Sequence, residues 1–173
     1  EMKDEPLPAN KKDYQKLLKK QEGYKLAEVK GKASSAFASN WENKTIELGK
    51  NTFGWKSLKL NFGKKQVTMT VTETNGKSYE LPFGYQQWMT TTFDSYPPYS
   101  ITPIDRFKGL EGPYYASGSY AWISKEELQL KVHYVNWVSA LEITFRLDEN
   151  GEVKLNVQTN YIKKPYSISG KIK

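Results

Sequence analysis

The side chains of this 173-residue chain that could carry out chemistry are few. A hydrolase that pairs a serine nucleophile with a lysine base needs Ser-x-x-Lys, which places the lysine one helical turn from the serine. No serine of the chain is followed by lysine at that spacing. The tripeptide Tyr134-Val135-Asn136 matches a Tyr-x-Asn element of such enzymes, but it has no nucleophile to activate. The sequence therefore predicts that the chain is not an enzyme.

Metal and cofactor sites are not predicted either. His133 is the only histidine and there is no cysteine, which excludes a multi-histidine or thiolate metal site. His133 shares strand parity with Lys131 and Gln129, so we expect a lone histidine on an outer face. The run from Asp148 to Gly151 lacks the later glutamate of a calcium loop, so we interpret it as a turn. No glycine-rich loop leads from a strand into a helix, and no cofactor is predicted.

Aromatic side chains are the remaining candidates, because they make up 14% of the chain. Flat rings stack on sugars and on other flat molecules, although in a small barrel they more often form the core. Trp137 is of particular interest because we expect it in a turn beside Asn136, where an exposed ring could bind. The candidate ligand-binding residues are Trp88, Trp122, Tyr134 and Trp137.

Strands must position these rings. Between Gly54 and Trp88, three runs alternate apolar and polar residues at every second position, which predicts strands with one buried face. The Asn75-Gly76 pair between two of the runs predicts a hairpin with a type I′ turn, in which both residues have positive φ. The expected strands cover 44–48, 57–62, 67–72, 78–83, 114–123, 128–134, 141–147, 153–157 and part of 161–172.

These runs predict an all-β fold of about eight to ten antiparallel strands, with no βαβ pattern. An up-and-down, lipocalin-like barrel is favoured, because closure removes exposed sheet edges. A two-sheet β-sandwich is the alternative. Small residues at Ser117 and Gly118 indicate a bend where the sheet curls. Four prolines between 94 and 113 predict a long loop.

The first 35 residues are expected to form a linker and one helix, ahead of a barrel domain at 36–173. Asn10 can cap a helix over 11–22, and Gly23 can end it. One face of this helix carries Tyr14, Leu17 and Leu18, and lysines occupy the other. We expect the lysine face to serve solubility.

The charge of the chain limits its partners. The formal net charge is +7, and the excess is almost all lysine, with arginine only at Arg106 and Arg146. Nucleic-acid binding proteins favour the bidentate guanidinium of arginine, so no nucleic-acid partner is predicted. No apolar run approaches the roughly 20 residues of a transmembrane helix.

Several motifs together carry a family resemblance. They are Gly54-Trp55, Leu81-Pro82-Phe83-Gly84 followed by Trp88, Ala121-Trp122, Leu128-x-Leu130 and Ile143-x-Phe145. With these motifs the chain resembles a C-terminal accessory domain of bacterial β-lactamase-related serine hydrolases, the class C β-lactamase and D-Ala-D-Ala peptidase group. The proline-containing start and its helix are similar to the connector that follows the catalytic domain there. The catalytic portion is missing, so no catalytic residue carries over.

Three functions follow from these observations. The resemblance implies a non-catalytic accessory domain that packs on or assists a catalytic serine hydrolase domain of the same precursor, in a periplasmic or secreted setting. The alternative is a free-standing lipocalin-like barrel that binds a small apolar or glycan ligand, which the aromatic content and the proline-rich loop motivate. An interior filled with side chains would argue against that alternative. The least favoured function is an enzyme that uses His133 or the Tyr134 and Asn136 pair.

Overall fold

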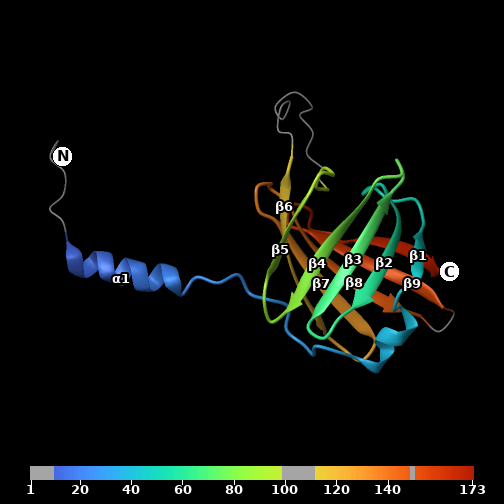
Figure 1. Cartoon of the computed structure of the whole chain (residues 1–173), viewed down its shortest axis with the longest axis horizontal. Coiled ribbons are helices and arrows are strands. Elements are labelled where there is room, and N and C mark those ends of the chain that lie inside the picture. The colour runs from blue at the N-terminus through green and yellow to red at the C-terminus, as the bar shows by residue number, and fades with distance from the viewer. Residues whose placement is uncertain (1–9, 99–111, 149–150) are drawn as a thin grey trace.

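The computed structural model describes residues 10–98, 112–148 and 151–173. Within these residues it contains one α-helix, a short 3-10 helix and ten strands (Figure 1). The helices are α1 (Lys11–Glu22) and η1 (Ala36–Asn40). The strands are β1 (Thr45–Leu48), β2 (Trp55–Phe62), β3 (Gln66–Glu73), β4 (Ser78–Tyr85), β5 (Met89–Phe93), β6 (Tyr114–Trp122), β7 (Glu127–Tyr134), β8 (Ala140–Leu147), β9 (Glu152–Thr159) and β10 (Tyr166–Ile172).

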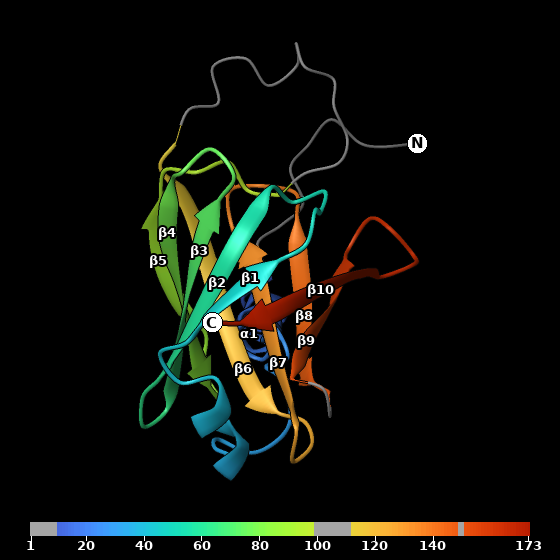
Figure 2. The same ribbon diagram turned by 90° about the vertical axis from the view of Figure 1, so that its right-hand side faces the viewer.

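The strands form a closed barrel, seen from its side in Figure 2. Their order is β4-β3-β2-β1-β10-β9-β8-β7-β6, and β6 returns to β4 through a short parallel pairing of Phe83–Tyr85 with Gly118–Tyr120. The other neighbours in the described ring are antiparallel, and β5 pairs with β6 alone. The predicted up-and-down, lipocalin-like barrel of eight to ten strands is therefore confirmed, and the two-sheet sandwich is not formed.

The hairpin between β3 and β4 lies where the sequence predicts it, but its turn type differs. Only Gly76 has a positive φ, at 87°, and Asn75 does not. The Gly76 amide donates to the Glu73 carbonyl, and the Glu73 amide donates to the Lys77 carbonyl. The loop between Glu73 and Lys77 therefore has three residues, 74–76. This is the longer hairpin with glycine in the left-handed position. The type I′ prediction was wrong because Thr74 belongs to the loop as well.

The inward faces of the strands fill the barrel. Leu60, Val67, Phe83, Leu130 and Ile143 come from five different strands, and each has an exposed fraction of 0%. A side chain beside a water-accessible cavity would keep some exposed surface, so the space around these residues is packed. The middle of the barrel therefore offers a ligand no free volume at these positions.

The two ends of the barrel differ. At one end, η1 lies against the barrel (Figure 2), and the residue that follows it, Trp41, is fully buried in the core. The chain reaches this end through backbone hydrogen bonds between Lys32 and Trp122 in both directions. The other end is formed by the turns after β3 and β7 and by the start of β6. Aromatic side chains gather there.

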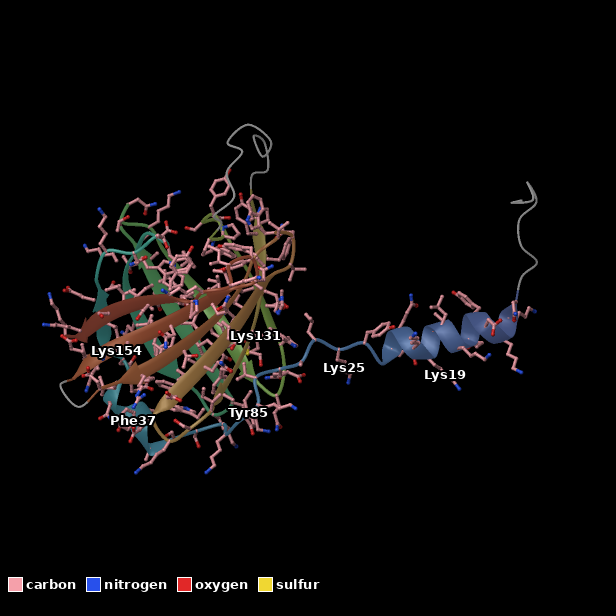
Figure 3. The ribbon with its side chains drawn as sticks, turned by 180° about the vertical axis from the view of Figure 1, so that it is seen from behind. Lys19, Lys25, Phe37, Tyr85, Lys131 and Lys154 are labelled. Atoms are coloured by element: carbon pink, nitrogen blue, oxygen red, sulfur yellow. The ribbon has the colours of Figure 1, made fainter. Side chains whose placement is uncertain are left out.

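The helix α1 stands away from the barrel (Figures 1 and 3). As predicted, the Asn10 side chain caps it by accepting from the Asp13 amide, at 3.1 Å, and it ends at Gly23. No residue of α1 is buried. No helix in the described residues is long and apolar enough to cross a membrane.

Candidate ligand-binding site

The four aromatic residues that the sequence singles out occupy three separate places. Tyr134 ends β7 inside the barrel, with 2% of its surface exposed. Trp137 lies in the following turn, half-buried, with its ring edge-on to Tyr114 at 5.5 Å. Phe93 links the two, because its ring lies 5.7 Å from Tyr134 and 6.0 Å from Tyr114. The structure therefore brings Tyr134 and Trp137 into one cluster.

Trp122 lies at the opposite end of the barrel. It pairs with Leu128, whereas Tyr134 pairs with Ala116, so about 20 Å of strand separates the two rings. Its ring is stacked between Trp41 and Phe62, at centroid distances of 5.5 and 5.9 Å. Trp122 is thus a core residue that helps to close this end.

A hollow of about 480 Å³ lies beside Trp122, and two of the three serine hydroxyls that line it, those of Ser35 and Ser124, are already engaged. The Ser35 hydroxyl caps η1 and donates to the Lys125 carbonyl at 2.6 Å. The Ser124 hydroxyl accepts from the amides of Glu126 and Glu127. These two hydroxyls hold the local loops together, and Ser34, Lys32 and Lys125 also line the hollow.

Trp88 lies on the outer surface, next to His133. The two rings meet edge to face at 5.2 Å, and the Trp88 indole donates to the Leu26 carbonyl at 3.0 Å. His133 is on the outer face, as predicted, but it is half-buried, because Trp88 contacts its ring. Burial lowers the pKa of His133, and the nearby Lys131 acts in the same direction. Trp88 therefore helps to attach the N-terminal segment to the barrel.

The ring of strands has one gap in its backbone pairing, which lies between β4 and β5. Gly118 of β6 is paired with Met89 of β5 and with Phe83 of β4. From Gly118 toward the start of β6 the partner strand is β5, and from Gly118 toward the end of β6 the partner strand is β4. The first half of β4 and the second half of β5 thus face each other with no paired residues in the described structure.

A groove of about 460 Å³ follows this gap, and we call it the seam groove. Its volume lies within the roughly 300–1,000 Å³ that is typical of small-molecule sites. Tyr79 and Phe93, which are 9% and 6% exposed, form its apolar floor, and their rings stack on each other at 5.2 Å and 29°. The residues that line the seam groove are Lys77, Ser78, Tyr79, Glu80, Thr91, Thr92, Phe93, Asp94 and Ser95.

Several polar side chains of the seam groove are available to a ligand. Within the described residues, Lys77, Thr92 and Asp94 make no side-chain hydrogen bond or ion pair that would occupy them. Ser78 and Glu80 are partly engaged, by the hydroxyls of Thr72 and Thr70 at 2.9 and 3.3 Å. The seam groove thus presents hydrogen-bond donors and acceptors, with charges of both signs.

The Tyr134 hydroxyl lies behind Phe93, and among the described residues it has no hydrogen-bond partner. Burial raises its pKa well above the ordinary value for tyrosine, and the neighbouring Tyr79, Tyr161 and Glu73 act in the same direction. Burial also raises the pKa of Tyr79, although the neighbouring Trp55 acts in the opposite direction. Both hydroxyls are therefore neutral at any physiological pH, and each can donate a hydrogen bond.

Asn136, the remaining enzyme candidate, is engaged with backbone groups. The Asn136 side chain accepts from the Tyr115 amide at 2.9 Å and donates to the Pro113 carbonyl at 3.1 Å. It thus holds the end of β6 against the turn after β7. The described residues contain no group of three or more histidine, aspartate or glutamate side chains placed to bind a metal ion.

Sequence reasoning missed Phe93 and the polar residues of the seam groove. The alternation of apolar and polar residues around Tyr79 predicts that its side chain points inward. Phe93 follows four polar or flexible residues in the run Met-Thr-Thr-Thr-Phe, so alternation gives no such prediction for its side chain. No local signal indicates that β4 pairs with β6 in place of β5. The prolines at 97 and 98, directly after the seam groove, were the available hint, because they mark the end of pairing. On the predicted proline-containing loop, Tyr96 packs on Tyr114 at 5.3 Å, and Tyr99 lies outside the described residues.

Comparison with known proteins yields a structural likeness only. No protein-family model and no curated protein matches the sequence. Among solved structures, one match is the wild-type fluorescent protein UnaG, with a TM-score of 0.46 and 11% sequence identity. The match covers 73% of this chain and 93% of UnaG.

Proposed function

We propose that this chain is a non-enzymatic barrel that binds a small, hydroxyl-rich ligand, such as a glycan unit, in the seam groove. The observation that carries the proposal is the groove itself. It lies where the barrel is not closed by strand pairing, and it combines two aromatic rings with unengaged polar side chains. A sugar has the matching surface, with one apolar face and hydroxyl groups around it.

The packed interior argues against any ligand held inside the barrel, apolar or glycan, so we place the proposed ligand in the seam groove. Central side chains such as Leu60 and Ile143 have no exposed surface, so an apolar molecule would have to displace them. The seam groove needs no such displacement. Its polar lining would also leave an apolar ligand beside desolvated charges such as Asp94, which is unfavourable.

The experiment is a titration of the isotope-labelled chain, followed by amide chemical shifts in NMR. The probes are maltotriose and chitotriose as glycans, and 8-anilinonaphthalene-1-sulfonate as an apolar dye. We expect a glycan to shift amides of 77–80 and 91–95 and to leave the region around Trp122 unchanged. Shifts caused by the dye alone, or centred on Trp122, would contradict the proposal.

A matched pair of variants locates the binding site. Thr92→Arg places a long side chain in the seam groove and should weaken glycan binding by at least about tenfold. Thr90→Arg changes the same strand and the same outer face but lies outside the groove lining, so binding should be retained. Equal weakening by both variants would show that the ligand does not bind in the seam groove.

The accessory-domain function remains a second candidate, supported by the free position of α1. A helix with no buried residue that stands off the barrel is the arrangement expected of a connector to another domain. In that case the chain would serve a serine hydrolase domain of the same precursor, in a periplasmic or secreted protein. The test is whether a domain with Ser-x-x-Lys precedes the chain in its reading frame. Hydrolysis of nitrocefin by the isolated chain would contradict both candidates.

A further inference from the structure

The helix α1 exposes apolar side chains that the barrel does not cover. Tyr14 and Leu17 are 59% and 50% exposed, and Leu18 lies beside them on the same helix face. The exposed apolar set continues past the helix with Tyr24 and Leu26, which are 70% and 58% exposed. We call these five residues the α1 apolar face. Tyr14, Leu17, Tyr24 and Leu26 each leave half or more of their surface in water, and this apolar area could be buried against a partner.

Positive charge surrounds the α1 apolar face. The helix contains five lysines against two acidic residues, Asp13 and Glu22, and one of the five, Lys16, is paired with Asp13 at 3.0 Å. At 100° per residue, Lys11 and Lys20 lie on the two sides of the apolar stripe, and Lys12, Lys16 and Lys19 lie opposite it. Figure 3 shows Lys19 on the helix and Lys25 after it, both projecting into solvent.

The attachment of the segment leaves the helix free to meet a surface. The first hydrogen bonds from the segment after α1 to the barrel run from the Trp88 indole to the Leu26 carbonyl and from the Val29 amide to the Ser119 hydroxyl. Val29 is 6% exposed, so the barrel surface begins there. The helix ends four residues before Leu26, and α1 can therefore lie on a plane while the barrel stays in water.

We infer that α1 binds the surface of a membrane that contains anionic lipids. A short helix with an apolar face and a lysine-rich polar face lies in the membrane interface, with its apolar side chains among the acyl chains. The two tyrosines suit the headgroup level, and long lysine side chains reach back to the lipid phosphates. This inference concerns a different part of the molecule from the seam groove, and neither depends on the other.

Because its positive residues are lysines, α1 is better suited to a lipid surface than to an acidic protein groove. The positive residues of α1 are all lysine, whose compact and strongly hydrated ammonium group suits a diffuse layer of negative charge. Recognition of carboxylates at fixed positions favours arginine, whose planar group pairs with them at two points. A second copy of the chain is disfavoured as the occupant, because its α1 would bring the same positive charge.

The test is co-sedimentation of the full chain with vesicles. Phosphatidylcholine vesicles are compared with vesicles in which about one third of the lipid is phosphatidylglycerol. We expect the anionic vesicles to bind at least about tenfold more chain at low salt, with most of this binding lost at high salt. Circular dichroism should show the helix content rising when anionic vesicles are added. Equal binding to both kinds of vesicle, or binding to neither, would overturn the inference.

Variants separate the apolar contribution from the charge. Leu17→Gln with Leu18→Gln keeps good helix formers and the net charge, and should reduce binding at least about fivefold. Lys16→Gln with Lys19→Gln and Lys20→Gln should reduce it similarly. The matched control removes three exposed barrel lysines, Lys44, Lys56 and Lys59, and should retain most of the binding.

Two further outcomes would contradict binding through α1. If the barrel lysine control loses as much binding as the α1 lysine variant, net charge alone accounts for the attraction. If the chain forms dimers in analytical ultracentrifugation, and the Leu17→Gln and Leu18→Gln variant abolishes them, the α1 apolar face is covered by a second copy. All these variants leave the barrel core unchanged, so loss of folding does not confound the result.

Discussion

Tyr79 and Phe93 stack their rings at 5.2 Å, although the strands that carry them share no paired residues in the described structure. Side chains thus hold β4 and β5 together where the backbone ladder is missing. Phe93 extends this contact to Tyr134 of β7, at 5.7 Å. The aromatic cluster therefore does two things, since it forms the apolar part of the seam groove and closes the barrel behind it.

A double-mutant cycle on Tyr79→Leu and Phe93→Leu should show this coupling. Each single change should lower the free energy of unfolding, and the double variant should be destabilised by about 0.5–1.5 kcal/mol less than the sum. The measurement is urea unfolding followed by circular dichroism. The control cycle combines Tyr79→Leu with Phe62→Leu, near Trp122, and its two effects should add. Full additivity in the first cycle would show that the stacked pair does not stabilise the gap.

Tyr134→Phe should keep the stability of the chain or raise it by up to about 1 kcal/mol. The reason is that the Tyr134 hydroxyl is buried without a hydrogen-bond partner among the described residues, so its desolvation is not compensated. The matched variant is Tyr120→Phe, because the Tyr120 hydroxyl donates to the Ala33 carbonyl at 2.9 Å. That change should cost about 1 kcal/mol. Equal losses in chemical denaturation would mean that the Tyr134 hydroxyl has a stabilising partner.

Gly118→Ala should destabilise the barrel by about 1–3 kcal/mol or more, through overpacking. A Cβ atom at this position would lie 2.4 Å from the Pro82 carbonyl oxygen and 2.7 Å from the Phe83 ring. Neither neighbour can move freely, since Phe83 pairs with Gly118 itself and Pro82 pairs with Thr68 of β3. Gly63→Ala is the control, because its Cβ would meet only ordinary contacts, at 3.5 Å and beyond. Thermal unfolding of the two variants should differ clearly, and a neutral Gly118→Ala would argue that β4 and β6 are less closely packed.

The half-buried His133 predicts a loss of stability in weakly acidic solution. Burial lowers the pKa of His133 in the folded chain below its ordinary value of 6.5, so the unfolded chain binds a proton first as the pH falls. The contribution of His133 to the free energy of unfolding is complete above pH 6.5. It falls as the pH drops below 6.5, and it levels off below the pKa of His133 in the folded chain. His133→Gln should remove this component. Urea unfolding from pH 7.5 to 5.5 should show a smaller slope for the variant than for the parent chain, and identical slopes would contradict the prediction.

Much of the fold could be predicted from local patterns. Alternation with a period of two identifies strands such as β7 and β8, because each has one face in the core. Asn10 and Gly23 mark the ends of α1 through capping, which needs only neighbouring residues. The bend expected at Ser117 and Gly118 is the point where β6 changes its partner from β5 to β4.

The candidate site could not be predicted in the same way. The seam groove exists because two strands far apart in the sequence, β4 and β6, pair in parallel, and no local pattern contains that information. The expectation that Trp88, Trp122, Tyr134 and Trp137 belong to one set rests on residue type alone. In the structure, Trp88 lies on the outer surface, Trp122 lies in the core, and Tyr134 and Trp137 belong to the aromatic cluster at the other end of the barrel. Whether any of them binds a ligand stays a prediction.

The pairing of β1 with β10 has a consequence for folding. Ile46 lies beside Ile172, so the last gap in the cylinder can close only when almost the full length of the barrel sequence has been ordered. The entropy lost in bringing such distant positions together slows the search, and we expect refolding in milliseconds to seconds rather than microseconds. Until those two isoleucines meet, β1 and β10 each present an unpaired edge that another chain could occupy.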